Sequence, residues 1–202
     1  MGRPFDADGT RIRVRLDAQE RQLLARLLDE VAQLLDDGRP RSDDPLAVLV
    51  GFDLRLPDDA PEGDAEEDAE DEDPPGDEDP ALARLLPAAH RDDPELAAEF
   101  RRLTESGLRD RKRSSLALAS AALQRRGHVV LSREEASALL KGLTDTRLVL
   151  GERLGLQTDE DADMIADVRP PRGGDDDPWV AVVLLYDVLT WWQESLVTVL
   201  SR

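Results

Sequence analysis

The densest group of side chains that could do chemistry is a run of cations between residues 101 and 113. Its members are Arg101, Arg102, Arg109, Arg111, Lys112 and Arg113. Arg102, Arg109 and Arg113 are spaced to share one face of a helix, so the run could bind phosphate groups or an acidic partner. The alternative is a solvated helix face whose cations have partners within the chain. Interleaved aromatic residues, which single-stranded nucleic acid favours, are missing from the run, and no clean helix-turn-helix spacing is present.

A second candidate is an arginine at an apolar position of a helix. The stripe consists of Ala136, Leu139, Leu140, Leu143, Arg147, Leu150 and Leu154. A buried guanidinium needs a hydrogen-bonded carboxylate, because an uncompensated buried charge is very costly. Asp187 and Glu194, on the apolar segment at the C-terminal end, are the expected partners of Arg147. We interpret this set as a structural ion pair that fixes helix register, with a ligand or partner site as the alternative.

Other chemistries find little support in the residue types. The sequence has no cysteine, which excludes disulfides, thiolate metal sites and thiol-based redox switches. Asp159-x-Asp161-x-Asp163 resembles the start of a calcium loop, but Met164 and Pro170 stand where the loop needs Gly and a bidentate Glu. His90 and His128 are far apart, and nucleotide-loop and hydrolase motifs are absent. We therefore expect a protein without catalytic residues, metal or cofactor.

The negative charge of the chain is concentrated in one segment. The formal net charge is -19, and 14 of the 45 acidic residues lie between Asp58 and Asp79, where there is no Lys or Arg. Like-charged runs of this kind repel themselves and stay solvated, and the prolines and glycines of the segment oppose a continuous helix. We expect residues 57–79 to form a disordered acidic loop within a single domain of residues 1–202.

The elements that must position the candidate residues begin with a hairpin. Asp8-Gly9 is a turn signal, and residues 11–16 alternate polar and apolar, with Ile12, Val14 and Leu16 expected to face a core. A helix should follow at once, because Asp17 and Glu20 form a capping box. Its apolar stripe is formed by Leu23, Leu24, Leu27, Leu28, Val31, Leu34 and Leu35.

Further helices are expected along the rest of the chain. Residues 80–86 can form a brief helix, and Asp93-Pro94 starts a long one that Gly127 ends. Residues 129–131 are extended, and they count as a strand only if they meet the hairpin. Ser132 and Glu135 form a second capping box, which opens the helix that carries Arg147.

The segment from Trp179 to Leu200 is apolar on nearly every side. It is long enough to span a membrane, but Asp187 and the pair Gln193-Glu194 would make insertion costly. A helix that is apolar all round is normally the central helix of a bundle, with at least one of Trp191 and Trp192 in the core. We expect a mainly α-helical bundle around this C-terminal helix, with a small N-terminal hairpin. Since the first residues lack the apolar stretch of a secretory signal, we expect a cytoplasmic protein without a membrane contact.

Three stretches of the sequence resemble a known family. They are Phe100-Arg101-Arg102-x-Thr104 with Leu108-Arg109-x-Arg111-Lys112, then Leu143-x-Asp145-x-Arg147-Leu148-x-Leu150-Gly151-x-Arg153-Leu154-Gly155, and Tyr186-Asp187-x-Leu189-x-Trp191-x-Gln193-Glu194-Ser195-Leu196. They are similar to an actinobacterial domain-of-unknown-function family that includes the oxidative-stress transcriptional regulator AosR. The resemblance spans most of the chain apart from the acidic segment.

The resemblance implies a non-enzymatic transcriptional regulator that acts with a sigma factor and RNA polymerase, and it leaves DNA contacts open. Genes of the family tend to lie beside the gene for the proteolytic adaptor ClpS, so an adaptor or interaction module linked to proteolysis is the alternative. Oxidant sensing in the family is ascribed to a cysteine pair. Since this chain has no cysteine, that mechanism is not expected here.

Overall fold

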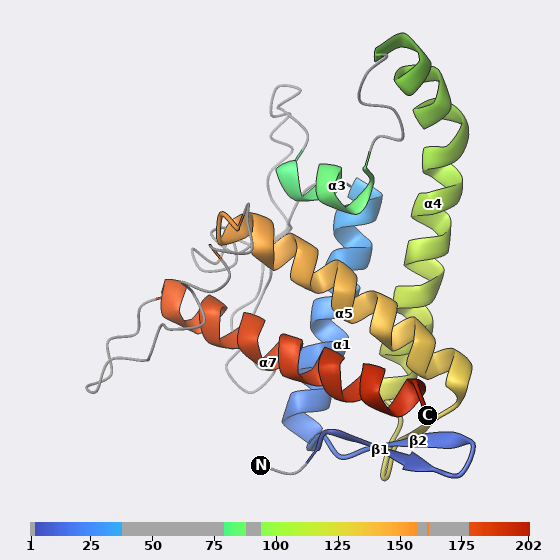
Figure 1. Cartoon of the computed structure of the whole chain (residues 1–202), viewed down its shortest axis with the longest axis vertical. Coiled ribbons are helices and arrows are strands. Elements are labelled where there is room, and N and C mark those ends of the chain that lie inside the picture. The colour runs from blue at the N-terminus through green and yellow to red at the C-terminus, as the bar shows by residue number, and fades with distance from the viewer. Residues whose placement is uncertain (1–2, 38–78, 88–93, 157–160, 162–177) are drawn as a thin grey trace, which may run out of the picture.

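The computed structural model is mostly helical (Figure 1). It describes residues 3–37, 79–87, 94–156, 161 and 178–202, with only the backbone described for residues 37, 94–104 and 178. The helices are α1 (Ala18–Asp37), α3 (Pro80–Leu85), α4 (Pro94–Leu123), α5 (Arg133–Arg153) and α7 (Pro178–Leu200). The strands are β1 (Phe5–Asp8), β2 (Arg11–Val14) and β3 (Val130–Leu131). The expected fold class, mainly α with an N-terminal hairpin and an apolar C-terminal helix, is confirmed.

The hairpin forms in the register that the alternation predicts. β1 and β2 are antiparallel with Phe5 opposite Val14, and Gly9 supplies the positive φ of 63° that the turn requires. Ile12, Val14 and Leu16 are buried. The extended residues 129–131 do meet this hairpin, because β3 pairs antiparallel with β2. The result is a three-stranded sheet in the order β1-β2-β3.

Helix α1 begins and packs as its sequence indicates. The backbone N–H of Asp17 donates to Glu20 Oε2 at 2.8 Å, and the N–H of Glu20 donates back to Asp17 Oδ1 at 2.9 Å. The expected apolar stripe is buried, apart from Leu23, which is partly buried. This stripe packs against α4 and α5.

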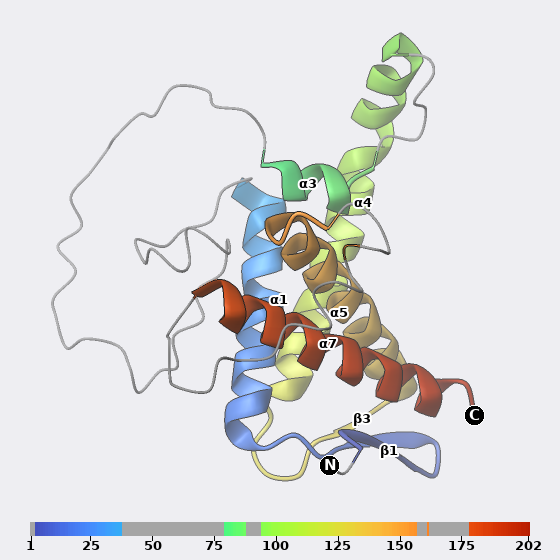
Figure 2. The ribbon, with the colours of Figure 1, turned by 60° about the vertical axis from the view of Figure 1, so that its left-hand side comes forward.

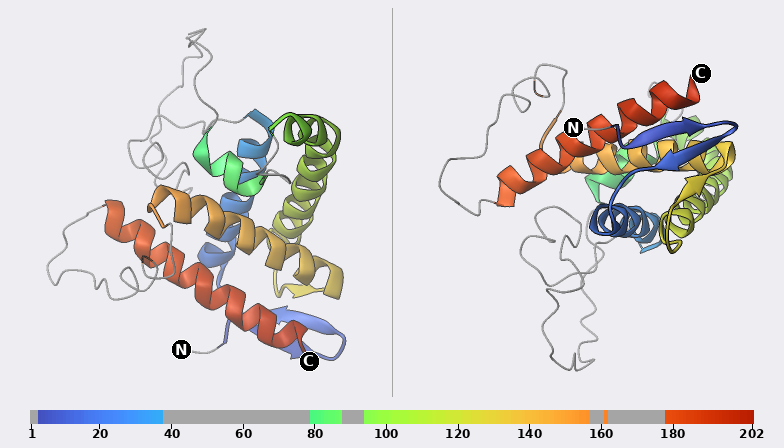
Figure 3. Two further views of the ribbon diagram at one scale, coloured as in Figure 1. Left: turned by 45° about the horizontal axis from the view of Figure 1, so that its top comes forward. Right: turned by 90° about the horizontal axis from the view of Figure 1, so that it is seen from below.

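Helix α5, rather than α7, is the central helix of the bundle. It contacts α1, α3, α4 and α7 as well as β2 and β3, and it lies between α7 and α4 (Figure 3). Small residues allow this position: a Cβ built on Gly142 would lie 2.5 Å from Leu28 Cδ2 and 3.4 Å from Leu116 Cδ2. The expectation that α7 occupies the middle is therefore wrong, because close approach on several sides depends on small side chains as much as on apolar ones.

Helix α7 covers one side of α5 and also contacts β1 (Figure 2). Val182, Leu189, Trp192 and Leu196 on its inner face are buried, and Trp192 is one of the largest fully buried side chains. Among the described residues, the segment Trp179–Leu200 is the one stretch whose length and composition would suit a membrane span. A core helix of a soluble protein has the same length and composition, and 39% of this apolar stretch is buried inside the structure.

The acidic segment lies outside the described residues except for its last member. Residues 57–78 are not among those that the structure places, whereas Asp79 is the N-cap of α3 and accepts a hydrogen bond of 2.9 Å from the N–H of Ala81. The carboxylate of Asp79 also pairs with Arg153 of α5. Assigning Asp79 to a disordered loop is therefore wrong, because its side chain begins a helix and anchors it to α5.

Candidate functional site

The C-terminal half of the basic run is tied to other parts of the chain. Arg109 donates to the backbone carbonyl of Leu35 at 2.5 Å and to Glu105 at 2.6 Å. Arg113 forms an ion pair of 2.5 Å with Asp36. These bonds join α4 to the last turn of α1, where backbone carbonyls lack partners within their own helix. The geometry thus favours the alternative of intramolecular partners for Arg109 and Arg113.

Arg101 and Arg102 lie in the part of α4 of which the backbone alone is described. This part of the helix extends past α3 and past the ends of α1 and α5 (Figure 2). The structure therefore separates the basic run into two regions. Arg101 and Arg102 are on the projecting end of α4, and Arg109 to Arg113 lie against the bundle.

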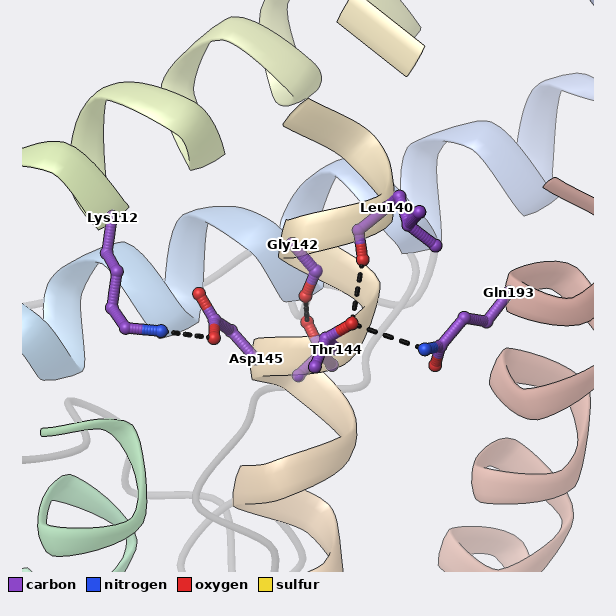
Figure 4. Close-up of polar contacts among 7 residues, drawn as sticks. Lys112, Leu140, Gly142, Thr144, Asp145 and Gln193 are labelled. Atoms are coloured by element: carbon purple, nitrogen blue, oxygen red, sulfur yellow. Dashed lines mark hydrogen bonds and ion pairs between the residues drawn. The ribbon is translucent and has the colours of Figure 1, made fainter. Parts of the chain in front are cut away.

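Lys112 is paired with Asp145 of α5 (Figure 4). Lys112 Nζ lies 2.5 Å from Asp145 Oδ1, and the two side chains are 21% and 7% exposed. Burial raises the pKa of the Asp145 carboxyl above its ordinary value, while the bond and charge of Lys112 act in the opposite direction. A buried charge of this kind is stable only with such a partner. The pair therefore links α4 to α5 at the edge of the hydrophobic core.

A groove adjoins this pair, between α4 and α5. Its volume is about 380 Å³, and it is lined by Leu108, Arg111, Lys112, Ser115, Lys141, Thr144 and Asp145. Arg111 and Lys141 are exposed, and neither forms an ion pair with another described residue. Among the described residues, the groove therefore presents two cations without an ion-pair partner beside Lys112, which is paired with Asp145.

Arg147 has neutral partners on α7. It donates to Gln193 Oε1 at 2.7 Å and to the hydroxyl of Tyr186 at 3.0 Å. The expected ion pair with Asp187 or Glu194 is wrong: within the described residues, neither carboxylate bonds to Arg147. Residues 186 and 193 are seven apart and face α5, whereas the next residue along is rotated by about 100° on a helix. Glu194 is accordingly exposed and Asp187 half-buried.

Thr144 connects the groove to the Arg147 cluster. Gln193 Nε2 donates to Thr144 Oγ1 at 3.2 Å, and the threonine hydroxyl donates to the carbonyl of Leu140 at 3.0 Å (Figure 4). Gln193 therefore uses both ends of its amide on α5. Polar contacts on two sides of α5 thus hold its neighbours: Asp145 binds Lys112 of α4, and Thr144 binds Gln193 of α7 (Figure 4).

Sequence reasoning found Arg147 and Lys112 but missed their partners Asp145, Tyr186 and Gln193. A signal for the last two was present, since they are residues with polar groups seven apart in a mainly apolar helix. Lys141 was missed as well, although it is one of only two lysines in a chain with 24 arginines. The other is Lys112, and both line the same groove.

Several hydroxyl groups of the described helices bond to the backbone of their own helix. The hydroxyls of Ser137, Thr146, Thr190 and Thr198 each donate to the backbone carbonyl four residues earlier, which is a common bond of helix hydroxyls. Within the described ranges, no group of three or more His, Asp or Glu side chains could hold a metal ion. His128 is exposed.

Comparison with known proteins gives a family and nothing finer. No curated protein matches the sequence, and no solved structure matches the fold. A family described as "Domain of unknown function (DUF2017)" matches residues 2–200. The match includes the α4, α5 and α7 segments that build the groove and the Arg147 cluster. The chain therefore belongs to the DUF2017 family.

Proposed function

We propose that the protein is a non-enzymatic regulator in the cytoplasm that acts by binding another protein. The proposed partner is the transcription machinery, through a sigma factor or RNA polymerase. The choice of partner rests on the resemblance of residues 100–112, 143–155 and 186–196 to the family that includes AosR. Thiol-based oxidant sensing is not part of the proposal, because the chain has no cysteine.

The observation that carries the proposal is a row of apolar side chains on the outer side of α7. Leu184 and Val188 are each 38% exposed and lie one turn apart, and Trp191 continues the row at helical spacing with part of its surface exposed. Contiguous exposed apolar side chains that include an aromatic residue are typical of protein-binding surfaces. We refer to Leu184, Val188 and Trp191 as the outer row of α7.

Direct binding to nucleic acid receives less support than protein binding. Arg109, Lys112 and Arg113 are engaged within the chain, and a formal net charge of -19 repels a polyanion. The test is DNA binding as a function of salt for the native chain and for R102E/R109E/R113E. A DNA-binding regulator would show a steep salt dependence that the triple variant reduces; equal binding would remove this surface from the proposal.

The decisive experiment is affinity purification from the native host with the native chain and L184D/V188D. We expect the native chain to recover sigma factor or RNA polymerase subunits and the variant to lose them. A matched control is A117D/A121D, which places two carboxylates one turn apart on an exposed side of α4. Thermal unfolding should be similar for the two variants, so that a difference in recovery reports the surface rather than the fold.

Recovery of protease components or of a ClpS-type adaptor without transcription proteins would overturn the transcription partner. It would favour the alternative function, an interaction module linked to proteolysis. Equal recovery by L184D/V188D and the native chain would instead show that the outer row of α7 is not the binding surface.

A further inference from the structure

The groove between α4 and α5 has an unusual distribution of charge for this chain. Arg111 and Lys112 reach it from α4, and Lys141 reaches it from α5. Among the described residues, Asp145 is the one carboxylate that lines it, and that carboxylate is held by Lys112. The groove therefore has an excess of positive charge on a protein whose formal net charge is -19.

Both lysines of the chain line this groove. Every other side chain that carries a full positive charge at neutral pH is an arginine. Lys112 is oriented by Asp145, whereas Lys141 and Arg111 are exposed and have no ion pair among the described residues. An exposed cation beside an apolar surface attracts a carboxylate more strongly when an apolar side chain lies next to that carboxylate. The apolar side chain excludes water from the contact, and this strengthens the attraction between the two charges.

We propose that this groove binds an acidic segment of a partner protein. A carboxylate of the segment is held by Arg111 and Lys141, and a neighbouring apolar side chain packs against Leu108. The inference rests on the proposed function as a protein-binding regulator and names the chemistry of the partner. It places a second contact on the molecule, on a different pair of helices from the one that carries the outer row of α7.

Three features favour an acidic protein segment over nucleic acid in this groove. Asp145 places a carboxylate in the wall, which opposes a dense row of phosphates more than it opposes a single carboxylate. The described residues of the lining include no aromatic side chain on which a base could stack. A volume of about 380 Å³ suits one or two side chains.

The two lysines make the groove directly observable. Reductive methylation with ¹³C-formaldehyde labels Lys112, Lys141 and the terminal amine while keeping their positive charge, and K141R assigns the Lys141 resonance. The probe is a capped synthetic peptide with Leu and Glu at i,i+4 spacing. We expect it to shift the Lys141 methyl resonance saturably, whereas a peptide with Gln in place of each Glu should bind at least about tenfold more weakly.

The matched variants are R111E/K141E and R11E/R126E, which change the net charge equally. Arg11 and Arg126 are exposed and do not line the groove. By fluorescence anisotropy with the labelled peptide, we expect R111E/K141E to weaken binding at least about tenfold and R11E/R126E to stay within about twofold. Equal weakening by both variants would overturn the proposal, since the peptide would then respond to overall charge alone.

Two further outcomes would also overturn it. One is equal binding of the Gln peptide, and the other is a single-stranded oligonucleotide that shifts the Lys141 resonance at a lower concentration than the peptide does. Affinity purification with R111E/K141E separates this inference from the proposed function. If the variant recovers the same transcription proteins as the native chain, the groove is not their site and the function stands; if the native chain recovers none, the function fails.

Discussion

The guanidinium carbon of Arg147 lies 4.9 Å from the ring centroid of Tyr186, while one Nη of the same group is 3.0 Å from the hydroxyl of that tyrosine. The same side chain therefore stacks on the ring and bonds to its edge. Together with the amide of Gln193, this arrangement holds a half-buried cation without a carboxylate from the part of the chain that the structure describes. Such contacts suit arginine in particular, because its planar group can stack and donate at once.

The first prediction concerns the cost of removing this cation. Arg147→Met should lower the free energy of unfolding by about 1 to 2 kcal/mol, because it removes two hydrogen bonds to neutral groups and one cation–π contact. Tyr186→Phe should cost about 1 kcal/mol, since the stacking remains. Urea unfolding measures both. A loss for Arg147→Met as large as that of a broken buried ion pair would show that a carboxylate is involved after all.

The second prediction concerns Lys112, which differs from Arg147 in having a charged partner. Lys112→Met leaves the carboxylate of Asp145 buried without a counter-charge and should cost about 3 kcal/mol. This is the lower end of the usual range, because the Lys112 side chain keeps 21% of its surface exposed. Adding Asp145→Leu should restore part of the loss, as measured by urea unfolding. A double variant less stable than Lys112→Met would contradict this account.

The third prediction is a dependence of stability on pH. Burial raises the pKa of the half-buried Asp187 above its ordinary value of 3.8. The folded state therefore binds the proton more tightly than the unfolded state, and this carboxyl disfavours folding as the pH rises through values just above 3.8. Asp187→Asn should be more stable than the native chain at pH 7, with the difference shrinking toward pH 4.

Thermal unfolding between pH 4 and pH 7 checks this dependence, with the exposed Asp110→Asn as control. The difference in stability between Asp110→Asn and the native chain should change less over this pH range. If the difference in stability between Asp187→Asn and the native chain is the same at pH 4 and pH 7, burial does not raise the pKa of Asp187.

The fourth prediction concerns the contact between α5 and α1. Gly142→Ala gains helix propensity of about 1 kcal/mol, but its Cβ would lie 2.5 Å from Leu28 Cδ2 in a fully buried position. Overpacking of this kind costs roughly 1 to 3 kcal/mol, so we expect a net loss of stability. In a Leu28→Ala background the same change should be stabilising, because the methyl group enters a cavity. Stability loss in both backgrounds would refute the steric explanation.

The starts of helices and the buried face of the hairpin could be predicted from the sequence, because each depends on residues that are close together along the chain. The capping box of Ser132 and Glu135 is present with both of its hydrogen bonds, and the Asp17–Glu20 box is present as well. The burial of Ile12 and Val14 follows directly from strand alternation. In each case the residues that decide the structure are within a few positions of one another, so no knowledge of the packing is needed.

The candidate site was less accessible, because its partners come from different helices. Lys112 and Asp145 are 33 positions apart, and nothing local indicates that the carboxylate and the amine meet. The choice between Asp187 and Tyr186 as partner of Arg147 depends on how α7 is rotated against α5. Adjacent residues of a helix point about 100° apart. Matching opposite charges therefore does not tell which of the two residues faces α5. The rotation is set by the packing of Leu189, Trp192 and Leu196 in the core.

The sheet joins segments that are far apart in the sequence. β1 and β2 are synthesised before α1 and α4, but their neighbours β3 and α7 emerge from the ribosome only after these helices. A two-stranded hairpin is marginally stable in water by itself. The hairpin must therefore wait, with Phe5 uncovered, until α7 has been synthesised, and a nascent chain stalled before α7 should be a target for chaperones or proteases at this hairpin.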